Sequence, residues 1–262
     1  MKQHQARKRF GQNFLTDPGI IERIVRGINP VPGEKLVEIG PGLGALTGPL
    51  LRRTGELDVI ELDRDIIPKL SHNCGQLGTL RVHQCDVLNF DFGALSKERS
   101  LRIVGNLPYN ISTPIIFHLV THAHCIRDMH FMLQKEVVAR LAAQPGGSEY
   151  GRLSVMAQLH FTITPLFLVP PQAFTPQPKV ESAIVRLIPH TTPLFELSSH
   201  DTFASLVKQA FSQRRKTLHN TLKEMCDDKM MQEAGIDPRQ RAQELSLSQF
   251  ARLSNLLYTY NK

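Results

Sequence analysis

The sequence predicts an α/β fold built on a doubly wound, mostly parallel sheet with helices on both faces. Short apolar runs alternate with segments of helical periodicity through most of the 262 residues. These apolar runs are nearly continuous, which is typical of parallel strands buried on both faces. A glycine-rich turn at residues 40–44 joins the first run to the helical segment after it. Ligands of open α/β sheets bind at such turns.

The first predicted element is a helix. Asp17 is a helix-capping residue, and Pro18 is tolerated in a first helical turn. Ile20, Ile24 and Ile28 then follow at helical spacing, and prolines and a glycine stop the pattern.

The alternating pattern comes next. Apolar runs predict strands at residues 35–39, 57–61, 80–84, 102–105 and 129–133. Amphipathic segments between and after them predict helices at residues 46–53, 66–74, 114–121 and 135–142.

The last third of the chain changes character. A helix at 153–160 precedes two predicted strands, 161–169 and 182–188, which we expect to form an antiparallel hairpin at the edge of the sheet. From residue 201 onward only helices are predicted, at 203–211, 217–225, 229–234 and 248–258. We therefore place a domain boundary near residue 192, with a sheet domain over 1–192 and a small all-α domain over 193–262.

Composition excludes several classes of protein. Hydrophobic residues make up 41% of the chain and charged residues 21%, which are values of a globular protein and not of a disordered one. No apolar run is long enough for a membrane span. The net charge of +7 suggests a polyanionic partner.

Cysteines and histidines give no sign of a metal site. The four cysteines lack a C-x-x-C pair, so free thiols in a reducing cytosol are expected. His118 and His122 lie one helical turn apart, but no Glu follows the first. The basic segment 1–16 has no apolar signal-peptide core, and we expect a cytoplasmic protein with no metal.

The turn at residues 40–44 predicts a cofactor site. Glycines such as Gly40 and Gly42 let the backbone turn tightly and approach a ligand. Glu61 ends the next strand, where a carboxylate can accept both ribose hydroxyls of an adenosine. This pattern does not separate NAD from S-adenosylmethionine. Asp86, just past the third strand, is placed to receive an adenine amine, although an Asp there is also a common helix cap.

The fourth strand ends in a tetrapeptide, Asn106-Leu107-Pro108-Tyr109, which predicts a reaction at an amine of an aromatic base. An amine on an aromatic base is a poor nucleophile because its lone pair is delocalised into the ring. Two fixed acceptors for its protons, the Asn106 amide oxygen and a carbonyl of Leu107 or Pro108, would localise that lone pair. Tyr109 offers a face on which a flipped-out base can stack.

With these motifs the chain resembles the ribosomal RNA adenine dimethyltransferases over essentially its whole length. The segments that carry the resemblance are 7–15 (RKRFGQNFL), 37–44 (VEIGPGLG), 59–63 (VIELD), 105–113 (GNLPYNIST), 130–136 (HFMLQKE), 150–155 (YGRLSV), 174–180 (FTPQPKV) and 211–217 (FSQRRKT).

The resemblance implies a class I methyltransferase fold with a seven-stranded sheet, and S-adenosylmethionine as the methyl donor. It implies that Asn13 and Leu15 line the donor site, that Gly40 approaches its methionine part, and that Glu61 and Asp86 hold ribose and adenine. Asn106 would serve both donor and target.

For the target base, the resemblance implies that Tyr109 and Phe174 sandwich the flipped adenine. The residues alone favour a core or loop position for Phe174. The implied product is two adjacent dimethylated adenosines in a hairpin loop near the 3′ end of 16S rRNA, made in an immature small ribosomal subunit and contributing to its biogenesis.

Two acid-free basic segments are candidate RNA contacts. Arg7, Lys8 and Arg9 lie in the first, and Arg214, Arg215 and Lys216 lie in the second, which spans 202–223. Each segment is either a phosphate-binding face or an ordinary solvated one. No oligomerisation pattern is visible, so a monomer is expected.

Two alternatives remain open at this point. An NAD-dependent dehydrogenase would use the same glycine turn, but it has no use for residues 106–109. A non-catalytic RNA-binding ribosome-assembly factor would keep the fold without needing the amine site.

Overall fold

A computed structural model describes residues 13–96, 98–109 and 111–260 of the protein. These residues form two compact units. The sheet unit comprises residues up to 138 together with 163–189, and the helical unit comprises 139–162 together with the residues from 190 onward. The predicted boundary at residue 192 differs from this division in the placement of residues 139–162.

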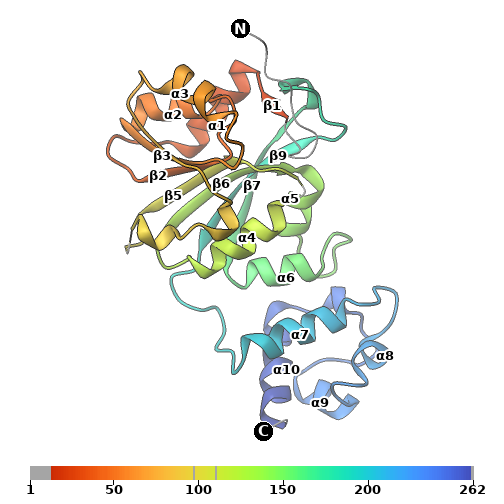
Figure 1. Cartoon of the computed structure of the whole chain (residues 1–262). Coiled ribbons are helices and arrows are strands. Elements are labelled where there is room, and N and C mark those ends of the chain that lie inside the picture. Colours follow the sequence, from red (N-terminus) through yellow and green to blue (C-terminus); the bar gives the residue numbers. More distant parts are fainter. Residues whose placement is uncertain (1–12, 97, 110, 261–262) are drawn as a thin grey trace. The chain divides into compact units, whose positions relative to one another are not determined.

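The sheet unit is organised around a seven-stranded sheet with the strand order β4-β3-β2-β5-β6-β9-β7 (Figure 1). Its strands are β2 (Leu36–Ile39), β3 (Glu56–Ile60), β4 (Thr79–His83), β5 (Leu101–Asn106), β6 (Ile126–Gln134), β7 (Phe161–Val169) and β9 (Ser182–Pro189). Strands β4, β3, β2, β5 and β6 pair in parallel, and β9 pairs antiparallel with β6. The mostly parallel sheet predicted from the apolar runs is therefore confirmed.

Helices cover both faces of this sheet. Figure 1 shows α1 (Pro18–Ile28), α2 (Thr47–Thr54) and α3 (Ile67–Cys74) on one side and α4 (Ser112–Thr121) on the other. The apolar stripes of α1 and α2 are buried against β2 and β3 in one core. Burial of these stripes is the main stabilising contribution.

The first helix begins as its sequence predicts. The Asp17 carboxylate accepts the N–H of Ile20 at 2.9 Å, and Pro18 occupies the first turn. At the other end, Asn29 adopts a left-handed conformation with φ of 50° and closes the helix.

A second, two-stranded sheet was not predicted. Strand β1 (Phe14–Leu15) pairs antiparallel with β8 (Phe174–Thr175), so that Leu15 lies opposite Phe174. Two-residue strands carry no periodic signal, and this pairing joins segments that are far apart in the sequence. It holds the chain around Asn13 against the sheet unit.

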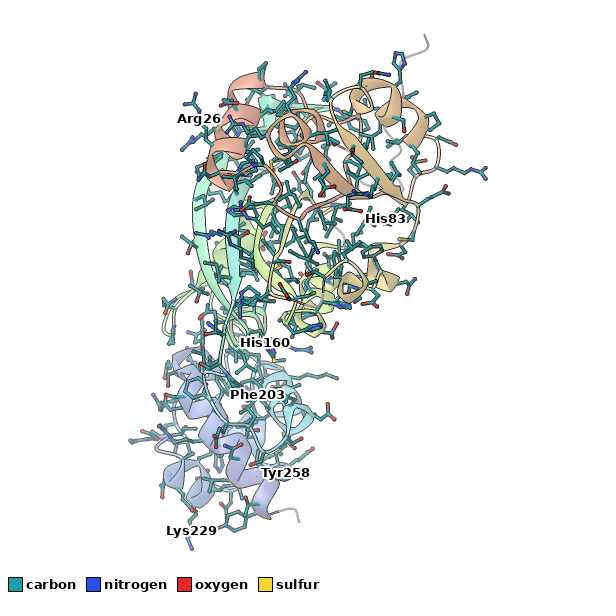
Figure 2. All side chains as sticks on the ribbon, turned by 90° about the vertical axis from the view of Figure 1, so that its left-hand side faces the viewer. Arg26, His83, His160, Phe203, Lys229 and Tyr258 are labelled. Atoms are coloured by element: carbon teal, nitrogen blue, oxygen red, sulfur yellow. The ribbon has the colours of Figure 1, made fainter. Side chains whose placement is uncertain are left out.

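The helical unit has its own core. Its helices are α6 (Arg152–Gln158), α7 (His200–Ala210), α8 (Leu218–Leu222), α9 (Asp228–Glu233) and α10 (Leu247–Tyr260), while α5 (Lys135–Ala142) spans residues of both units. Tyr150 and Val155 are buried in the same cluster as Phe203, which explains why 139–162 belong to this unit. Figure 2 shows Phe203 inside this unit and Lys229 projecting outward. No helix in the described ranges is long and apolar enough to cross a membrane.

Candidate functional site

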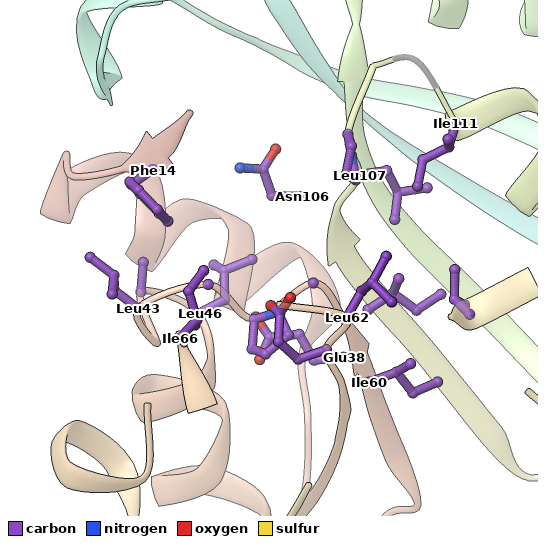
Figure 3. Close-up of a pocket in the computed structure, with 18 of the residues that line it drawn as sticks. Phe14, Glu38, Leu43, Leu46, Ile60, Leu62, Ile66, Asn106, Leu107 and Ile111 are labelled. Atoms are coloured by element: carbon purple, nitrogen blue, oxygen red, sulfur yellow. The ribbon is translucent and has the colours of Figure 1, made fainter. Parts of the chain in front are cut away.

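A cavity of about 590 Å³ lies at the carboxyl ends of β2, β3 and β5 (Figure 3). This volume is typical of small-molecule sites. The cavity brings together the predicted cofactor-binding residues and the whole tetrapeptide: Asn13, Leu15, Gly40, Gly42, Glu61, Asp86, Asn106, Leu107, Pro108 and Tyr109.

The glycine turn forms one wall. Gly40 and Gly42 have φ values of 65° and 55°, in the left-handed region that residues with a Cβ rarely adopt. A Cβ on Gly42 would also lie 3.3 Å from the Phe14 ring. These positions therefore keep the turn narrow and expose its backbone to the cavity.

Two buried carboxylates face the cavity from neighbouring strands. Glu38, on β2, is 2% exposed and accepts the Thr47 hydroxyl at 2.6 Å. Burial raises the pKa of Glu38 to about 7; the bond from Thr47 opposes this shift and the nearby charge of Glu61 adds to it. Glu61 accepts the backbone N–H of Asp63 at 2.8 Å, and burial raises its pKa as well.

Asp86 caps a short helix and also lines the cavity. Its carboxylate accepts the N–H of Leu88 at 3.0 Å and so caps a short 3-10 helix, Val87–Asn89. The same residue lines the cavity. The capping role suggested by the sequence is therefore present, and it fixes the carboxylate at the cavity wall.

The tetrapeptide begins at the end of β5. The Asn106 side-chain nitrogen donates to the Asn13 carbonyl at 3.0 Å. The amide oxygen therefore points away from β1, as Figure 3 shows. The Leu107 N–H is engaged by the Met132 carbonyl at 3.2 Å, and the Pro108 carbonyl accepts the Ile111 N–H at 3.2 Å. These bonds fix the acceptors of the tetrapeptide before any ligand binds.

Phe174 is not among the residues that line the cavity. It is 1% exposed and pairs with Leu15 across the small sheet. Its place beside the target base stays a prediction.

The two basic segments can be located only in part. Arg7, Lys8 and Arg9 lie outside the described residues. In the helical unit, Arg214 donates to the carbonyls of Ser148 and Tyr150. Arg215 and Lys216 are exposed.

Comparison with known proteins gives the family. The model of the family described as ribosomal RNA adenine dimethylase matches residues 3–259. The chain belongs to this family. It is therefore an enzyme that dimethylates adenines of ribosomal RNA. This selects methyl transfer over the dehydrogenase and over an assembly factor without catalysis.

Individual relatives agree with this assignment. The dimethylase is 56% identical to Ribosomal RNA small subunit methyltransferase A of Pseudomonas putida, over 97% of this chain and 96% of that protein. It is 55% identical to the protein of the same name from Saccharophagus degradans, over 98% of this chain and 97% of that protein.

Solved structures show the same fold. A dimethyladenosine transferase from Plasmodium falciparum is 27% identical with a TM-score of 0.78, covering 92% of this chain and 95% of that chain. The 23S rRNA methyltransferase ErmE is 25% identical with a TM-score of 0.73, covering 94% of this chain and 100% of that chain. The predicted class I methyltransferase fold is confirmed.

Sequence reasoning missed some residues of the site. Phe14, Glu38 and Leu62 line the cavity beside the predicted residues. Glu38 had a signal, because it is an acid inside an apolar strand. Leu62 is 51% exposed at the cavity and follows Glu61 directly, but a lone exposed leucine is ordinary.

Proposed function

We propose that the dimethylase binds S-adenosylmethionine in the cavity and methylates two adjacent adenosines in the hairpin loop near the 3′ end of 16S rRNA. The names of its curated relatives, which specify the small subunit, support this choice of RNA. The observation that carries the chemistry is the Asn106 amide, whose nitrogen is fixed by Asn13 so that its oxygen is presented as an acceptor.

The cavity residues fit an adenosine-containing cation. Glu61 and Asp86 both line the cavity at strand ends, which supports the proposal that Glu61 accepts the ribose hydroxyls and Asp86 the adenine amine. The buried Glu38 carboxylate is suited to a positively charged ligand. When bound, S-adenosylmethionine supplies an electrophilic methyl group on a positively charged sulfur.

The tetrapeptide is suited to activate the adenine amine. The Asn106 oxygen and one backbone carbonyl accept hydrogen bonds from its two N–H groups. The nitrogen forms the bond to the methyl carbon as the sulfur–carbon bond breaks, and the N–H proton that the methyl group replaces passes to solvent. The Pro108 carbonyl already accepts the Ile111 N–H, so the Leu107 carbonyl is the better second acceptor. Tyr109 provides the stacking face. Catalysis then comes from positioning and from polarisation of the amine, with no metal in the step.

An Asn106→Ala variant tests this role. We expect methyl incorporation into immature small subunits to fall at least about 100-fold, a typical loss for a fixed polar group at a reacting centre. Asn255→Ala is a matched control, since Asn255 also donates its amide to a carbonyl, that of Glu196 at 2.8 Å, and neither residue lines the cavity. Labelled S-adenosylmethionine measures turnover, and calorimetry measures donor and subunit binding. Retained turnover in Asn106→Ala would contradict the assignment.

The cellular setting is part of the same proposal. The substrate is an immature small subunit, so the enzyme acts in the cytoplasm and takes part in subunit biogenesis. We expect a monomer, with the basic residues of 7–9 and 214–216 contacting RNA phosphates. Light scattering on the purified protein and on its complex with small subunits tests whether the protein is a monomer.

A further inference from the structure

The Tyr109 side chain is anchored at its far end. Its hydroxyl lies 2.8 Å from the Ser182 hydroxyl, and either oxygen can donate. Ser182 is the first residue of β9 and is fully buried. At its other end, the Tyr109 carbonyl accepts the Ser112 hydroxyl at 3.2 Å. Tyr109 is thus held through both its backbone and its phenol.

Ser182 itself is rigidly placed. It lies opposite Gln134 in the antiparallel pairing of β6 with β9. Just beyond this pair, the Lys135 N–H donates to the Glu181 carbonyl at 3.0 Å, and the two side chains form an ion pair at 2.7 Å. The hydroxyl of Ser182 therefore belongs to the end of the sheet and not to a loop.

The anchor controls a degree of freedom that stacking depends on. A tyrosine side chain turns about two bonds, and rotation about the first, Cα–Cβ, swings the whole ring to another place, so a base can stack on it only in one such rotamer. A hydrogen bond at the para oxygen, which lies on the ring axis, fixes the direction of that axis and hence the place of the ring, and it leaves the ring faces open. Tyr109 lines the cavity with its ring half-buried. Burial raises the pKa of its phenol, while the Ser182 bond lowers it; the net shift is upward, so the phenol stays protonated at neutral pH.

We infer that Ser182 is a positioning residue for methyl transfer: its hydroxyl holds the axis of the Tyr109 ring, and so the place of the ring on which the target adenine stacks. The inference rests on the proposed function, in which Tyr109 stacks on the base. A buried serine hydroxyl is costly without a partner. Tyr109 provides that partner, which explains why a polar residue occupies this fully buried strand position.

A double-mutant cycle tests the inference. Ser182→Ala and Tyr109→Phe each remove the same hydrogen bond, and we expect each to lower kcat about 3- to 10-fold. This corresponds to a hydrogen bond of about 1 kcal/mol. The double variant should lose no more than either single one, because both lack one bond. The affinity of the Ser182→Ala variant for S-adenosylmethionine should stay unchanged, since Ser182 does not line the cavity.

Ser100→Ala is the matched control. Ser100 forms a hydroxyl–hydroxyl bond with Ser96, also at 2.8 Å, away from the cavity. Its loss should leave kcat unchanged even if the protein becomes slightly less stable. If Ser182→Ala does not fold, Tyr109→Phe removes the same bond without changing the buried strand position.

The outcomes separate this inference from the proposed function. Wild-type kcat in Ser182→Ala and Tyr109→Phe, together with an inactive Tyr109→Ala, overturns the inference alone. Additive losses in the double variant also overturn it, because Ser182 then acts independently of Tyr109. Full activity in Tyr109→Ala overturns the stacking role in the proposed function as well.

Discussion

The sheet unit holds buried carboxylates at both ends of its parallel strands, and it compensates their charges differently. At the carboxyl ends, Glu38 accepts a hydroxyl and Glu61 accepts a backbone N–H, and burial raises both pKa values. At the opposite end, Asp128 is 1% exposed and accepts both Nε and Nη2 of Arg102, at 2.9 and 3.1 Å. Burial raises the Asp128 pKa, but the bonds and charge of Arg102, together with His130 and Arg186, outweigh this and lower it. The pKa is therefore raised for the two carboxylates at one end of the strands and lowered for the carboxylate at the other end.

This difference separates the end of the sheet that lines the cavity from the end that supports the fold. Strand β5 carries Arg102 near one end and Asn106 at the other. A buried carboxylate paired with arginine is already neutralised, and breaking the pair is strongly destabilising. Among the described residues, no cationic side chain contributes to the pKa shift of Glu38 or of Glu61. In the proposed function, the positive charge at that end of the sheet comes from the sulfonium of the bound donor.

The largest expected effect is at the paired end. Arg102→Ala removes the two-bond partner of the buried Asp128 and a partner of the half-buried Glu34. Asp128 then keeps the 41% exposed Arg186 at 3.0 Å, and we expect a loss of about 3–5 kcal/mol in the free energy of unfolding. Arg102 also donates to the Ile28 carbonyl at the end of α1, at 2.6 Å, which adds to the loss. Urea unfolding at pH 7 measures it.

The control at that end is Arg127→Ala. Arg127 contacts Glu34 at the same 2.8 Å distance as Arg102, but its side chain is 56% exposed. An exposed pair contributes at most about 1 kcal/mol. Equal losses in Arg127→Ala and Arg102→Ala would contradict the distinction drawn between buried and exposed partners.

The next effect is at the unpaired end and has the opposite pH dependence. The pKa of Glu38 is about 7 in the folded protein, above its ordinary 4.5, so the folded state binds the extra proton between these values. Stability without ligand should then fall as pH rises from 4.5 to 7 and level off above it. Glu38→Gln removes this dependence. The difference between wild type and variant should change by about 2–3 kcal/mol between pH 5 and pH 8.

Asp128→Asn is the control for the titration. The folded pKa of Asp128 lies below its ordinary 3.8, so its stabilisation is present throughout pH 5–8 and is lost only at lower pH. Its destabilisation should therefore be the same at both pH values. Glu38→Gln should also weaken binding of S-adenosylmethionine, measured by calorimetry at pH 8. A pH-independent difference for Glu38→Gln would show that Glu38 is ionised in the free protein.

The sequence predicted what depends on neighbours along the chain. Helix α1 follows from Asp17, Pro18 and its apolar spacing, and the parallel strands follow from their continuous apolar runs. Because such strands end at one edge, Gly40, Glu61 and the tetrapeptide were expected in one cleft.

Contacts between distant segments could not be predicted in the same way. Nothing local indicates that Tyr109 meets Ser182, 73 residues further on, or that Asn106 meets Asn13. Charged residues within apolar runs, such as Glu38 and Arg102, do mark buried polar sites. The sequence does not distinguish the one that lacks a partner from the one that is paired, because the partner comes from another segment.

The smallest expected effect is on RNA affinity and concerns exposed cations of the helical unit. There, too, a side chain that already has a partner can be compared with its neighbours. Arg214, Arg215 and Lys216 are all exposed, but Arg214 already donates to the carbonyls of Ser148 and Tyr150, which leaves Arg215 and Lys216 as the cations to test. If each of these two neutralises one RNA phosphate, changing both to Gln should flatten the slope of log affinity against log salt by about 1.5–2 units.

The control for this slope changes Lys229 and Arg239, exposed cations of the same unit, to Gln. It alters the net charge equally but removes no proposed phosphate contact. Filter binding to small subunits over a range of salt concentrations measures both slopes. Equal slopes in the two double variants would mean that 215–216 form a solvated face, since counterion release depends on contact with phosphates and not on total charge.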